Sequence, residues 1–588
     1  MNQTLEDYVR EIIDKHSLDC YVIFNSDIHL NEYIRKKDMR VLQISNFSGS
    51  NGTVVISKEP CLITDSRYYI QAQNQSRFPL FKDKLSEYII LKQYKKVSFD
   101  TKTISSTRFK KLMETFSENS IEFVETEFKF DIKFEDDQYN SLSNEIVYLE
   151  QYTLKSYLHF SDASEGLEYD PAIKEYLSSL GFNNIDGNVT GSHYQDKIKR
   201  IRNIVDGKVL IITELDTIGW VLNLRGFDIE FNPVFFSFLV LTKDEVLLFT
   251  DKDIALDMVK VLPYNEFERY LETIVECPVV ISGDCNQFIY SKFKDVKLID
   301  TIRVLQATKN EVELCGMALA YFFDGLALTE LFGFINNNHN LTEKSISDEL
   351  HNIKTKFKGY VQPSFDTISS TGANAAIVHH RASLDRIDKN KVYLIDCGSQ
   401  YYFGTTDTTR TLFFGSDIDE QLRHDYTLVL KGQLNAMMKE YDFESNHSEI
   451  DEISRSFLKG EEKDFGHATG HGVGHFLCVH EHPPSIYDKT EDKLQPNMVF
   501  SIEPGYYKEE EYGIRVENLV VSRKTADKIK LTNITIVPYQ NKMVDANMLT
   551  KEEKEYYNLC NEKCIKTLQN YISYEAFEFL KNNSCKLE

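Results

Sequence analysis

Two aspartates beside strand-like runs place the strongest constraint on how this chain can fold. Asp396 ends the apolar run 392–395, and Asp407 lies in a second run, 405–411, with strand character. We expect a hairpin centred near Tyr401, with the two aspartates opposite each other on one face and their Cβ atoms about 5 Å apart. At that distance the carboxylates repel unless a cation lies between them. The alternative, two exposed loop aspartates, conflicts with the apolar run before Asp396.

A second pair of carboxylates follows the same pattern. Glu503 directly follows the apolar run 499–502, and Glu517 follows another apolar run beyond the charged turn 508–512. Buried glutamates are rare unless they are paired or bind a metal. A salt bridge to Arg515 would account for one of these glutamates but not for both.

The histidines are concentrated in one segment. Five of the 15 fall in the 16 residues from His467 to His482, and glycines punctuate the stretch 467–475, so the backbone can approach a ligand closely. One histidine with four carboxylates carries a charge that balances two divalent cations. Such oxygen-rich ligation favours Mn²⁺, with Co²⁺ or Zn²⁺ as alternatives. Two cations about 3.5–4 Å apart can hold a hydroxide and stabilise an oxyanion, which is hydrolytic chemistry.

Composition narrows the function classes. The chain has 588 residues and a formal net charge of −24, which repels phosphate backbones and argues against nucleic-acid binding. We find no run of 18 or more apolar residues and no secretory pattern, so we expect no membrane association. We expect a cytoplasmic protein whose ten cysteines are reduced thiols.

Helix and strand patterns alternate along the first half of the chain, which predicts an α/β (α+β) fold. Boundaries are expected near 150 and 305, and the weakly patterned stretch 140–190 is interpreted partly as a linker or insertion. Within the second unit, 209–212 and 218–222 are interpreted as strands, as are 235–241 and 246–249. The third unit, 306–588, carries nearly all of the chemical signal.

The order Asp396, Asp407, His471, Glu503, Glu517 resembles the metal-binding signature of the aminopeptidase P branch of the pita-bread metallopeptidases. The resemblance extends beyond the site. Segments 46–53 and 64–68 resemble the first domain of the long, three-domain cytosolic members. Their second domain is matched by 215–226 and 232–236, and their C-terminal extension by 537–543.

The resemblance implies two creatinase-like N-terminal α/β domains, 1–150 and 151–305, before a pita-bread catalytic domain with a C-terminal extension, 306–588. It also assigns roles. The implied metal ligands are Asp396, Asp407, His471, Glu503 and Glu517, of which Asp407 and Glu517 would contact both metals. The implied substrate-side histidines are His379, His467 and His480. Arg515 is expected to hydrogen-bond a ligand carboxylate, and Tyr507 is a further candidate for that supporting role.

The activity implied by the resemblance is release of the N-terminal residue from peptides with proline in second position. A metal-bridging hydroxide would attack the carbonyl carbon, and Glu503 would carry its proton to the proline nitrogen. His379 or His480 would help one metal to stabilise the oxyanion. The peptide's free amine would bind near Asp396.

Three alternatives share this fold. A prolidase has the same site but normally one N-terminal domain, and a methionine aminopeptidase lacks both leading domains. A non-catalytic pita-bread binding protein has lost ligands, whereas all five positions are filled here. The aromatic stretch 549–580 resembles the extension that long members use to form homodimers, so we expect a homodimer. The alternative is a helix packed on its own domain.

Overall fold

The computed structural model describes residues 4–130, 143–158, 170–183 and 187–588. The chain forms two compact units, one of Met1–Val147 with Tyr194–Arg303 and the other of Tyr148–His193 with Val304–Glu588. Residues 148–193 therefore group with the histidine-bearing unit. Of the stretch interpreted as linker or insertion, 140–142, 159–169 and 184–186 lie outside the described residues.

The first sheet of unit 1 has the strand order β4-β3-β2-β1-β5-β6. Its central strand is buried along its whole length, and it pairs antiparallel with β2 and parallel with β5. The strands are β1 (Cys20–Phe24), β2 (Thr53–Ile56), β3 (Cys61–Ile63), β4 (Leu80–Phe81), β5 (Lys96–Phe99) and β6 (Glu122–Phe123). The helices are α1 (Leu5–His16), α2 (Arg40–Ser45), α3 (Tyr69–Gln75), α4 (Leu85–Leu91) and α5 (Ser106–Glu118).

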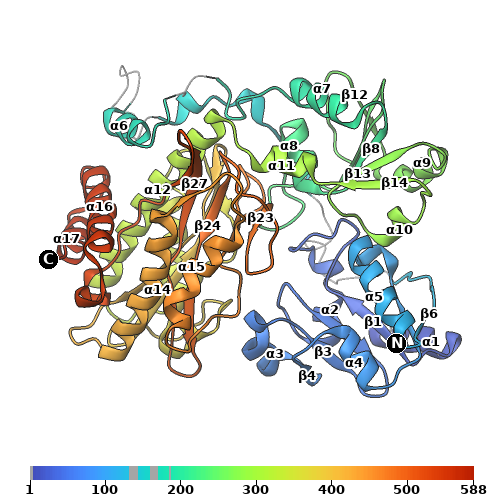
Figure 1. Ribbon diagram of the computed structural model, residues 1–588, viewed down its shortest axis with the longest axis horizontal. Coiled ribbons are helices and arrows are strands. Elements are labelled where there is room, and N and C mark those ends of the chain that lie inside the picture. The colour runs from blue at the N-terminus through green and yellow to red at the C-terminus, as the bar shows by residue number, and fades with distance from the viewer. Residues whose placement is uncertain (1–3, 131–142, 159–169, 184–186) are drawn as a thin grey trace. The chain divides into compact units, whose positions relative to one another are not determined.

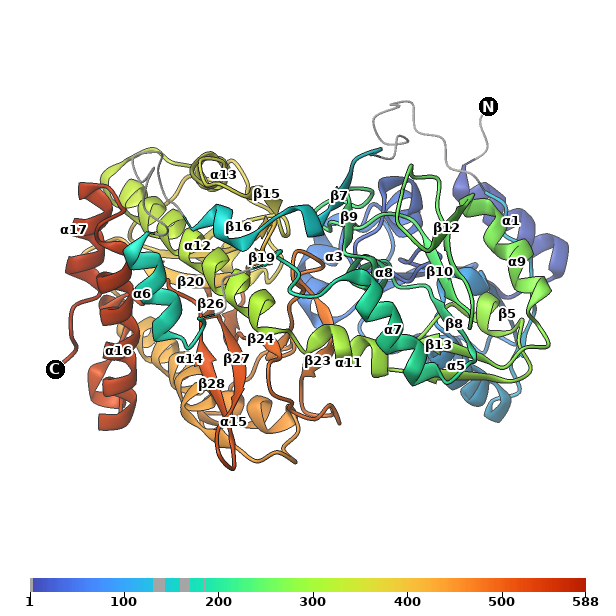
Figure 2. The same ribbon diagram turned by 90° about the horizontal axis from the view of Figure 1, so that it is seen from above.

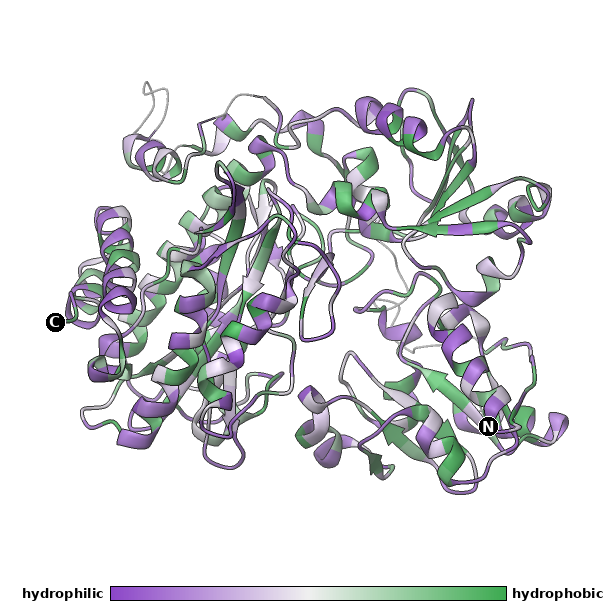
Figure 3. Cartoon of the chain, viewed as in Figure 1, coloured by the Kyte–Doolittle hydropathy of each residue, from purple (hydrophilic) through white to green (hydrophobic). Residues whose placement is uncertain are grey.

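The second sheet of unit 1 has the order β12-β11-β10-β8-β13-β14. Its strands are β8 (Val209–Ile212), β10 (Phe238–Leu241), β11 (Val246–Phe249), β12 (Val259–Leu262), β13 (Val279–Ser282) and β14 (Val296–Ile299). The helices are α7 (Tyr194–Val205), α8 (Leu215–Leu222), α9 (Phe267–Thr273) and α10 (Gln287–Tyr290), and the chain passes from unit 1 to unit 2 within α11 (Thr301–Ala307). The strands of this sheet are mostly green in Figure 3, and the helices beside them carry much of the purple.

One secondary-structure prediction in this region is wrong. The run 218–222, interpreted as a strand, lies in α8, whose residues are nearly all buried. A short apolar run bounded by polar residues has the same pattern in a buried strand and in a helix that is buried on every side, so hydrophobic periodicity could not separate the two.

The core of unit 2 is built on α12 (Glu311–Asn337), a helix whose residues are almost all buried. Among the described helices it is the one that is long and apolar enough to span a membrane, yet 89% of its most apolar window is buried inside the protein, as in a core helix. Helices α14 and α15 pack against each other beside the large sheet that contains β24 and β27 (Figure 1). The helices of this unit are α6 (Pro171–Ser179), α12, α13 (Glu343–Lys354), α14 (Glu420–Met438), α15 (Ser448–Lys459), α16 (Lys551–Leu568) and α17 (Tyr574–Asn583).

Two sheets of unit 2 carry the candidate site. The six-stranded sheet has the order β21-β28-β27-β24-β22-β23, and a three-stranded sheet has the order β16-β17-β20. The strands of these sheets are β16 (Ile368–Thr371), β17 (Val392–Cys397), β20 (Thr408–Phe413), β21 (Glu440–Tyr441), β22 (Gly470–Gly472), β23 (Glu481–Ile486), β24 (Val499–Ile502), β27 (Asn518–Lys524) and β28 (Ile529–Asn533). One smaller sheet has the order β15 (Tyr360–Pro363), β18 (Ser399–Tyr401), β19 (Gly404–Thr405), and another pairs β25 (Gly505–Lys508) with β26 (Tyr512–Arg515).

The C-terminal segment forms α16 and α17, which lie close to α12 and α6 (Figure 2). The aromatic side chains of this segment divide between the interior and the surface. Tyr557 and Phe579 are buried within the unit, whereas Tyr574 is 73% exposed. Both the packing of a helix on its own domain and an outward-facing aromatic residue are therefore present.

Candidate metal centre

The first hairpin forms, but in a different register from the expected one. In the β17–β20 ladder Asp396 lies opposite Thr409, and β18–β19 continue the same register to a turn at residues 402–403. Asp396 and Asp407 are therefore diagonal neighbours rather than a directly opposed pair. The turn lies beyond Tyr401 because β18 and β19 extend the ladder past the carboxylates.

The alternation of side chains along β17 orients Asp396. Tyr393, Ile395 and Cys397 belong to the hydrophobic cluster that contains α12 and α13 residues. Because successive side chains of a strand point to opposite faces, Asp396 projects from the other face. Thr409, its cross-strand partner, lies on that same face.

The second hairpin brings the two glutamates opposite each other. Ile502 pairs with Asn518 in the β24–β27 ladder, and Gly505 pairs with Arg515 in the β25–β26 ladder. Both pairs fit one continuous register in which Glu503 faces Glu517. These two residues lie in the break between the ladders, where their backbone groups bond instead to neighbouring segments: Glu503 N donates to Thr469 O, and Glu517 N donates to Thr409 O.

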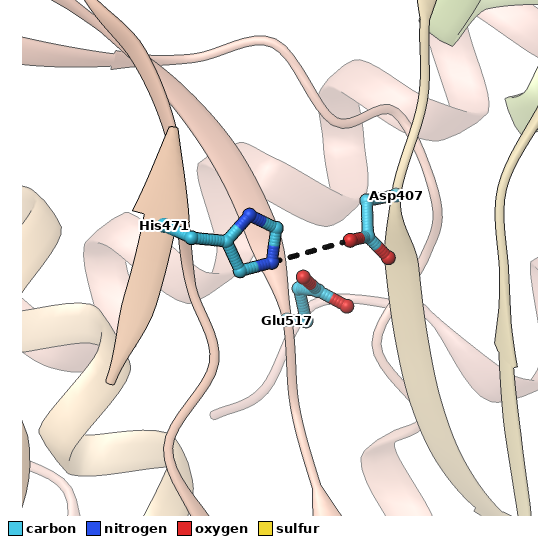
Figure 4. Close-up of side chains that lie close together, drawn as sticks. All are labelled: Asp407, His471 and Glu517. Carbon is cyan, nitrogen blue, oxygen red and sulfur yellow. Dashed lines mark ion pairs between the residues drawn. The ribbon is translucent and has the colours of Figure 1, made fainter. Parts of the chain in front are cut away.

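Three of the expected ligands converge on one point. Asp407, His471 and Glu517 each offer a ligand atom within 4.8 Å of the other two, a grouping that could hold a metal ion. Figure 4 shows the His471 ring projecting from β22 towards Asp407, with Glu517 beside them. The His471 Nε2 atom lies 3.5 Å from Asp407 Oδ2 and 3.4 Å from Glu503 Oε1.

The hydrogen bonding of His471 leaves one nitrogen suited to a metal. Its Nδ1 atom lies 2.9 Å from Gly472 O. A carbonyl oxygen only accepts, so Nδ1 carries the proton and the neutral ring presents the Nε2 lone pair to the carboxylates. A hydrogen bond of this kind to the second ring nitrogen also fixes the tautomer of metal-binding histidines.

The carboxylates also fit a cation cage. Asp396 Oδ1 and Glu517 Oε1 are buried and have no hydrogen-bond partner within the described part of the chain. Burial, together with Asp396 and Glu503, raises the pKa of Asp407 well above its usual value, and burial with Asp407 and Glu503 does the same to the pKa of Glu517. Buried carboxylates crowded together in this way are stabilised by divalent cations. The donor set therefore fits two such ions.

Arg515 links two of the carboxylates to the rest of the site. Its Nη2 atom donates to Asp396 Oδ2 at 2.6 Å, and its Nε atom donates to Thr409 Oγ1 at 3.1 Å. Thr409 Oγ1 in turn donates to Glu517 Oε2 at 2.9 Å. One buried guanidinium thus orients Asp396 directly and Glu517 through a hydroxyl.

Tyr507 connects this arrangement to His467. Arg515 Nη1 donates to the Tyr507 hydroxyl at 2.9 Å, and that hydroxyl lies 2.7 Å from His467 Nε2. His467 Nδ1 lies 2.7 Å from Ala468 O, so it holds the ring proton and Nε2 accepts from Tyr507. Burial raises the pKa of Tyr507 to about 12, which keeps the hydroxyl a donor. Both nitrogens of His467 are therefore engaged by the protein.

The other two expected substrate-side histidines occupy different settings. The His480 ring lies 4.3 Å from the His471 ring, centroid to centroid, at an interplanar angle of 71°, so it borders the ligand cluster. His379 is half-buried in the loop after the short helix η9 (Gly372–Ala376). That helix lies against β26, where a Cβ on Gly513 would fall 1.7 Å from Ala375 O.

A buried glutamate outside the expected set holds the His379 loop. Glu343, the first residue of α13, is 0% exposed. Its Oε1 accepts from Thr371 N at 2.8 Å, and its Oε2 accepts from His380 Nε2 at 2.7 Å and from Ser383 N and Oγ at 3.0 and 2.7 Å. Burial opposes ionisation, but hydrogen bonds from His380, Asn374 and Ser383 hold the pKa of Glu343 at about 2.

Sequence reasoning did not single out Thr409 or Glu343. Thr409 lies two residues after Asp407 in a strand, so the period of two would have placed it on the face of the ligands. Glu343 follows Thr342 at a helix start, a pattern that indicates a cap and gives no sign of the loop it binds.

Comparisons with known proteins agree with the fold. Residues 315–524 match the model of metallopeptidase family M24, and 528–587 match the C-terminal region of peptidase M24. Residues 7–129 and 182–313 each match a creatinase/prolidase N-terminal domain. The architecture is therefore two creatinase-type α/β domains followed by a pita-bread domain, as expected.

Relatives match over nearly the whole chain. Xaa-Pro aminopeptidase 1 of Dictyostelium discoideum is 31% identical, covering 98% of this chain and 95% of the relative. The probable Xaa-Pro aminopeptidase P of Sordaria macrospora is 32% identical, covering 96% and 95%. The X-prolyl aminopeptidase of Caenorhabditis elegans, whose crystal structure is described as a cytosolic enzyme with a di-nuclear active site, superposes with a TM-score of 0.86 at 25% identity over 97% of this chain and 95% of that one.

The fold and the carboxylate cage define a metal-dependent hydrolase. The chain belongs to metallopeptidase family M24, and the relatives that match nearly its whole length are named Xaa-Pro aminopeptidases.

Proposed function

We propose that the protein is an aminopeptidase that releases the N-terminal residue from peptides with proline in second position. The observation that carries the proposal is the convergence of Asp407, His471 and Glu517 in a chain that matches Xaa-Pro aminopeptidases over nearly its full length. The full set of ligands proposed is Asp396, Asp407, His471, Glu503 and Glu517. The ions proposed are two divalent cations, with Mn²⁺ favoured by the oxygen-rich donor set and Co²⁺ or Zn²⁺ as alternatives.

When bound, such ions supply an acidified water as nucleophile and a Lewis acid for the substrate carbonyl. The chain's own residues supply the proton chemistry. Glu503 accepts the proton of the attacking water and delivers it to the proline nitrogen, which needs a proton to leave. In the metal-free chain, burial raises the pKa of Glu503, and His471 and Arg515 oppose the rise.

The histidines and Arg515 position the substrate and the ligands. His480, whose ring contacts that of His471, and His379 donate to the carbonyl oxygen as negative charge develops on it. The peptide's free amine binds near Asp396. Arg515 and Tyr507 hold Asp396 and His467 in place, and His467 with nearby apolar side chains forms a wall for the proline ring.

Two observations argue against the alternative functions, a prolidase and a non-catalytic binding protein. Prolidases normally have one N-terminal domain, whereas two creatinase-type segments precede the M24 segment here, which favours the longer aminopeptidases. A non-catalytic binding protein would have no need of all five ligand positions. We further propose a cytoplasmic homodimer built from the C-terminal domain, with peptides as its partners, and domain boundaries near 150 and 305.

Three peptides test the proposal: Arg-Pro-Pro, Arg-Ala-Pro and N-acetylated Arg-Pro-Pro, at equal concentration. Only the first should release its N-terminal residue as free arginine at a high rate. An Xaa-Pro bond has no amide N–H, so the site needs a proton donor at that nitrogen and apolar walls around the ring. Equal cleavage of Arg-Ala-Pro would refute the proline requirement, and cleavage of the acetylated peptide would refute the amine requirement. The Glu503→Gln variant gives the background rate of arginine release.

A further inference from the structure

Two residues of α12, one helical turn apart, form hydrogen bonds with the hairpin that carries Asp407. The first is Tyr321, which is 0% exposed. Its hydroxyl accepts from Asp407 N at 2.8 Å and donates to Asp407 O at 2.8 Å. A single side chain therefore satisfies both backbone groups of one expected ligand.

The second residue is Asp324, also 0% exposed. Its Oδ1 accepts from Ser399 Oγ at 2.8 Å and from Tyr401 Oη at 2.9 Å, and its Oδ2 accepts from Thr406 Oγ1. These donors come from both arms of the first hairpin. Lys354 of α13 lies 3.3 Å from Asp324 Oδ2, so the buried charge is paired.

The two arms are also tied to each other at this point. Thr406 Oγ1 accepts from Ser399 N at 2.9 Å, while Lys354 Nζ donates to Gly398 O at 3.3 Å. The helix and hairpin approach closely: a Cβ added to Gly316 would lie 2.3 Å from Phe403 O, and one added to Gly404 would lie 2.9 Å from Met317 Cα. The hairpin therefore has little room to move relative to α12.

This hold matters because Asp407 lies among other carboxylates of the proposed ligand set. Glu517 offers a ligand atom within 4.8 Å of one on Asp407, and Glu503 Oε1 lies 3.4 Å from the His471 Nε2 atom, which itself lies 3.5 Å from Asp407 Oδ2. Without cations, crowded carboxylates separate if the backbone allows it. A backbone fixed at Asp407 leaves only side-chain rotation, so the ligands stay close to their binding positions and less ordering is needed when metal binds.

We infer that Tyr321, Thr406 and the Asp324–Lys354 pair are positioning residues that keep the Asp407 hairpin in its metal-binding conformation before the ions arrive, and so set the affinity for them. This inference rests on the proposed dinuclear centre. None of these residues is a proposed metal ligand. They act on the backbone and the side-chain neighbours of one ligand, Asp407.

The test is a calorimetric titration of the chelator-treated, full-length protein with Mn²⁺. Tyr321→Phe keeps the ring and removes both hydroxyl contacts, leaving two buried backbone groups unpaired, so Mn²⁺ affinity should fall about tenfold. Thr406→Val removes the contact to Asp324 and should also weaken binding. The matched control is Tyr441→Phe, because Tyr441 is equally buried and its hydroxyl also donates to a backbone carbonyl, that of Ala436, at 2.8 Å.

The outcomes separate the inference from the function it rests on. The inference is supported if Tyr321→Phe and Thr406→Val bind Mn²⁺ more weakly while Tyr441→Phe binds as the unaltered protein does and all keep the same circular dichroism. It is overturned if Tyr321→Phe binds with unchanged affinity, or if the Tyr441→Phe control weakens binding equally. Failure of the unaltered protein to bind Mn²⁺ would overturn both this inference and the proposed centre.

Discussion

Replacing Glu343 by glutamine should both destabilise the protein and slow its turnover. The carboxylate accepts hydrogen bonds from Thr371, Asn374, His380 and Ser383, with both oxygens engaged. An amide keeps one acceptor oxygen and presents two N–H groups on the other side. His380 can shift its ring proton and the Ser383 hydroxyl can rotate, but the Ser383 backbone N–H cannot adapt and is left unpaired.

The size of the effect follows from those contacts. One buried N–H without a partner, together with the loss of charge-assisted hydrogen bonds, costs about 2 kcal/mol of the free energy of unfolding at pH 7. The pKa of Glu343 is about 2 in the folded protein, below its usual 4.5. Its stabilisation is therefore complete above pH 4.5 and is lost as the pH falls towards 2. The gap between the free energies of unfolding of the unaltered protein and the variant should narrow as the pH falls below 4.5 and largely close near pH 2.

The assay compares urea unfolding at pH 7 and below pH 4.5 with steady-state hydrolysis of Arg-Pro-Pro at pH 7. Because the contacts hold the loop that carries His379, for which a catalytic role is proposed, kcat should fall about tenfold, since small displacements of catalytic groups are costly. Glu349→Gln, a change of the same type on the same helix, is the control and should alter neither quantity. Unchanged stability and unchanged kcat in Glu343→Gln would refute the reasoning.

Three further predictions concern the ligands, Tyr507 and the assembly. Asp407→Ala removes a ligand proposed to contact both metals, so both ions should weaken together, and metal analysis that still finds two tightly bound ions would contradict the assignment. Tyr507→Phe removes the hydroxyl between His467 and Arg515, so kcat should fall about tenfold with metal content unchanged; unaltered kcat would count against that role. Light scattering at micromolar concentration should give the mass of a dimer, and a monomeric mass would dismiss the role proposed for the C-terminal segment.

Part of the candidate site could be predicted because Asp396, Glu503 and Glu517 directly follow apolar runs. Glu503 and Glu517 follow buried strand positions, and the structure places them opposite each other. The register of the first hairpin was not predictable in the same way. The pattern of polar and apolar residues does not say where a turn falls, and here β18 and β19 carry the ladder on to residues 402–403.

Contacts between distant segments account for what the sequence could not show. Tyr321 touches the backbone of a residue 86 positions away, and an apolar helix gives no sign of which hydroxyl will do so. For Asp324 the sequence predicts only that it is paired, since an acid inside an apolar helix needs a partner. Its partners could not be predicted because they come from three separate segments. The helix at 218–222 escaped prediction because it is buried on every side.

Restoring metal to the metal-free protein is the most direct test of whether this protein is a dinuclear metalloaminopeptidase. Mn²⁺ is added in known equivalents per chain while the release of arginine from Arg-Pro-Pro is recorded. We predict negligible turnover without metal and a rise that levels off at two equivalents. Full turnover without metal, or none at any Mn²⁺ concentration in folded protein, would contradict it.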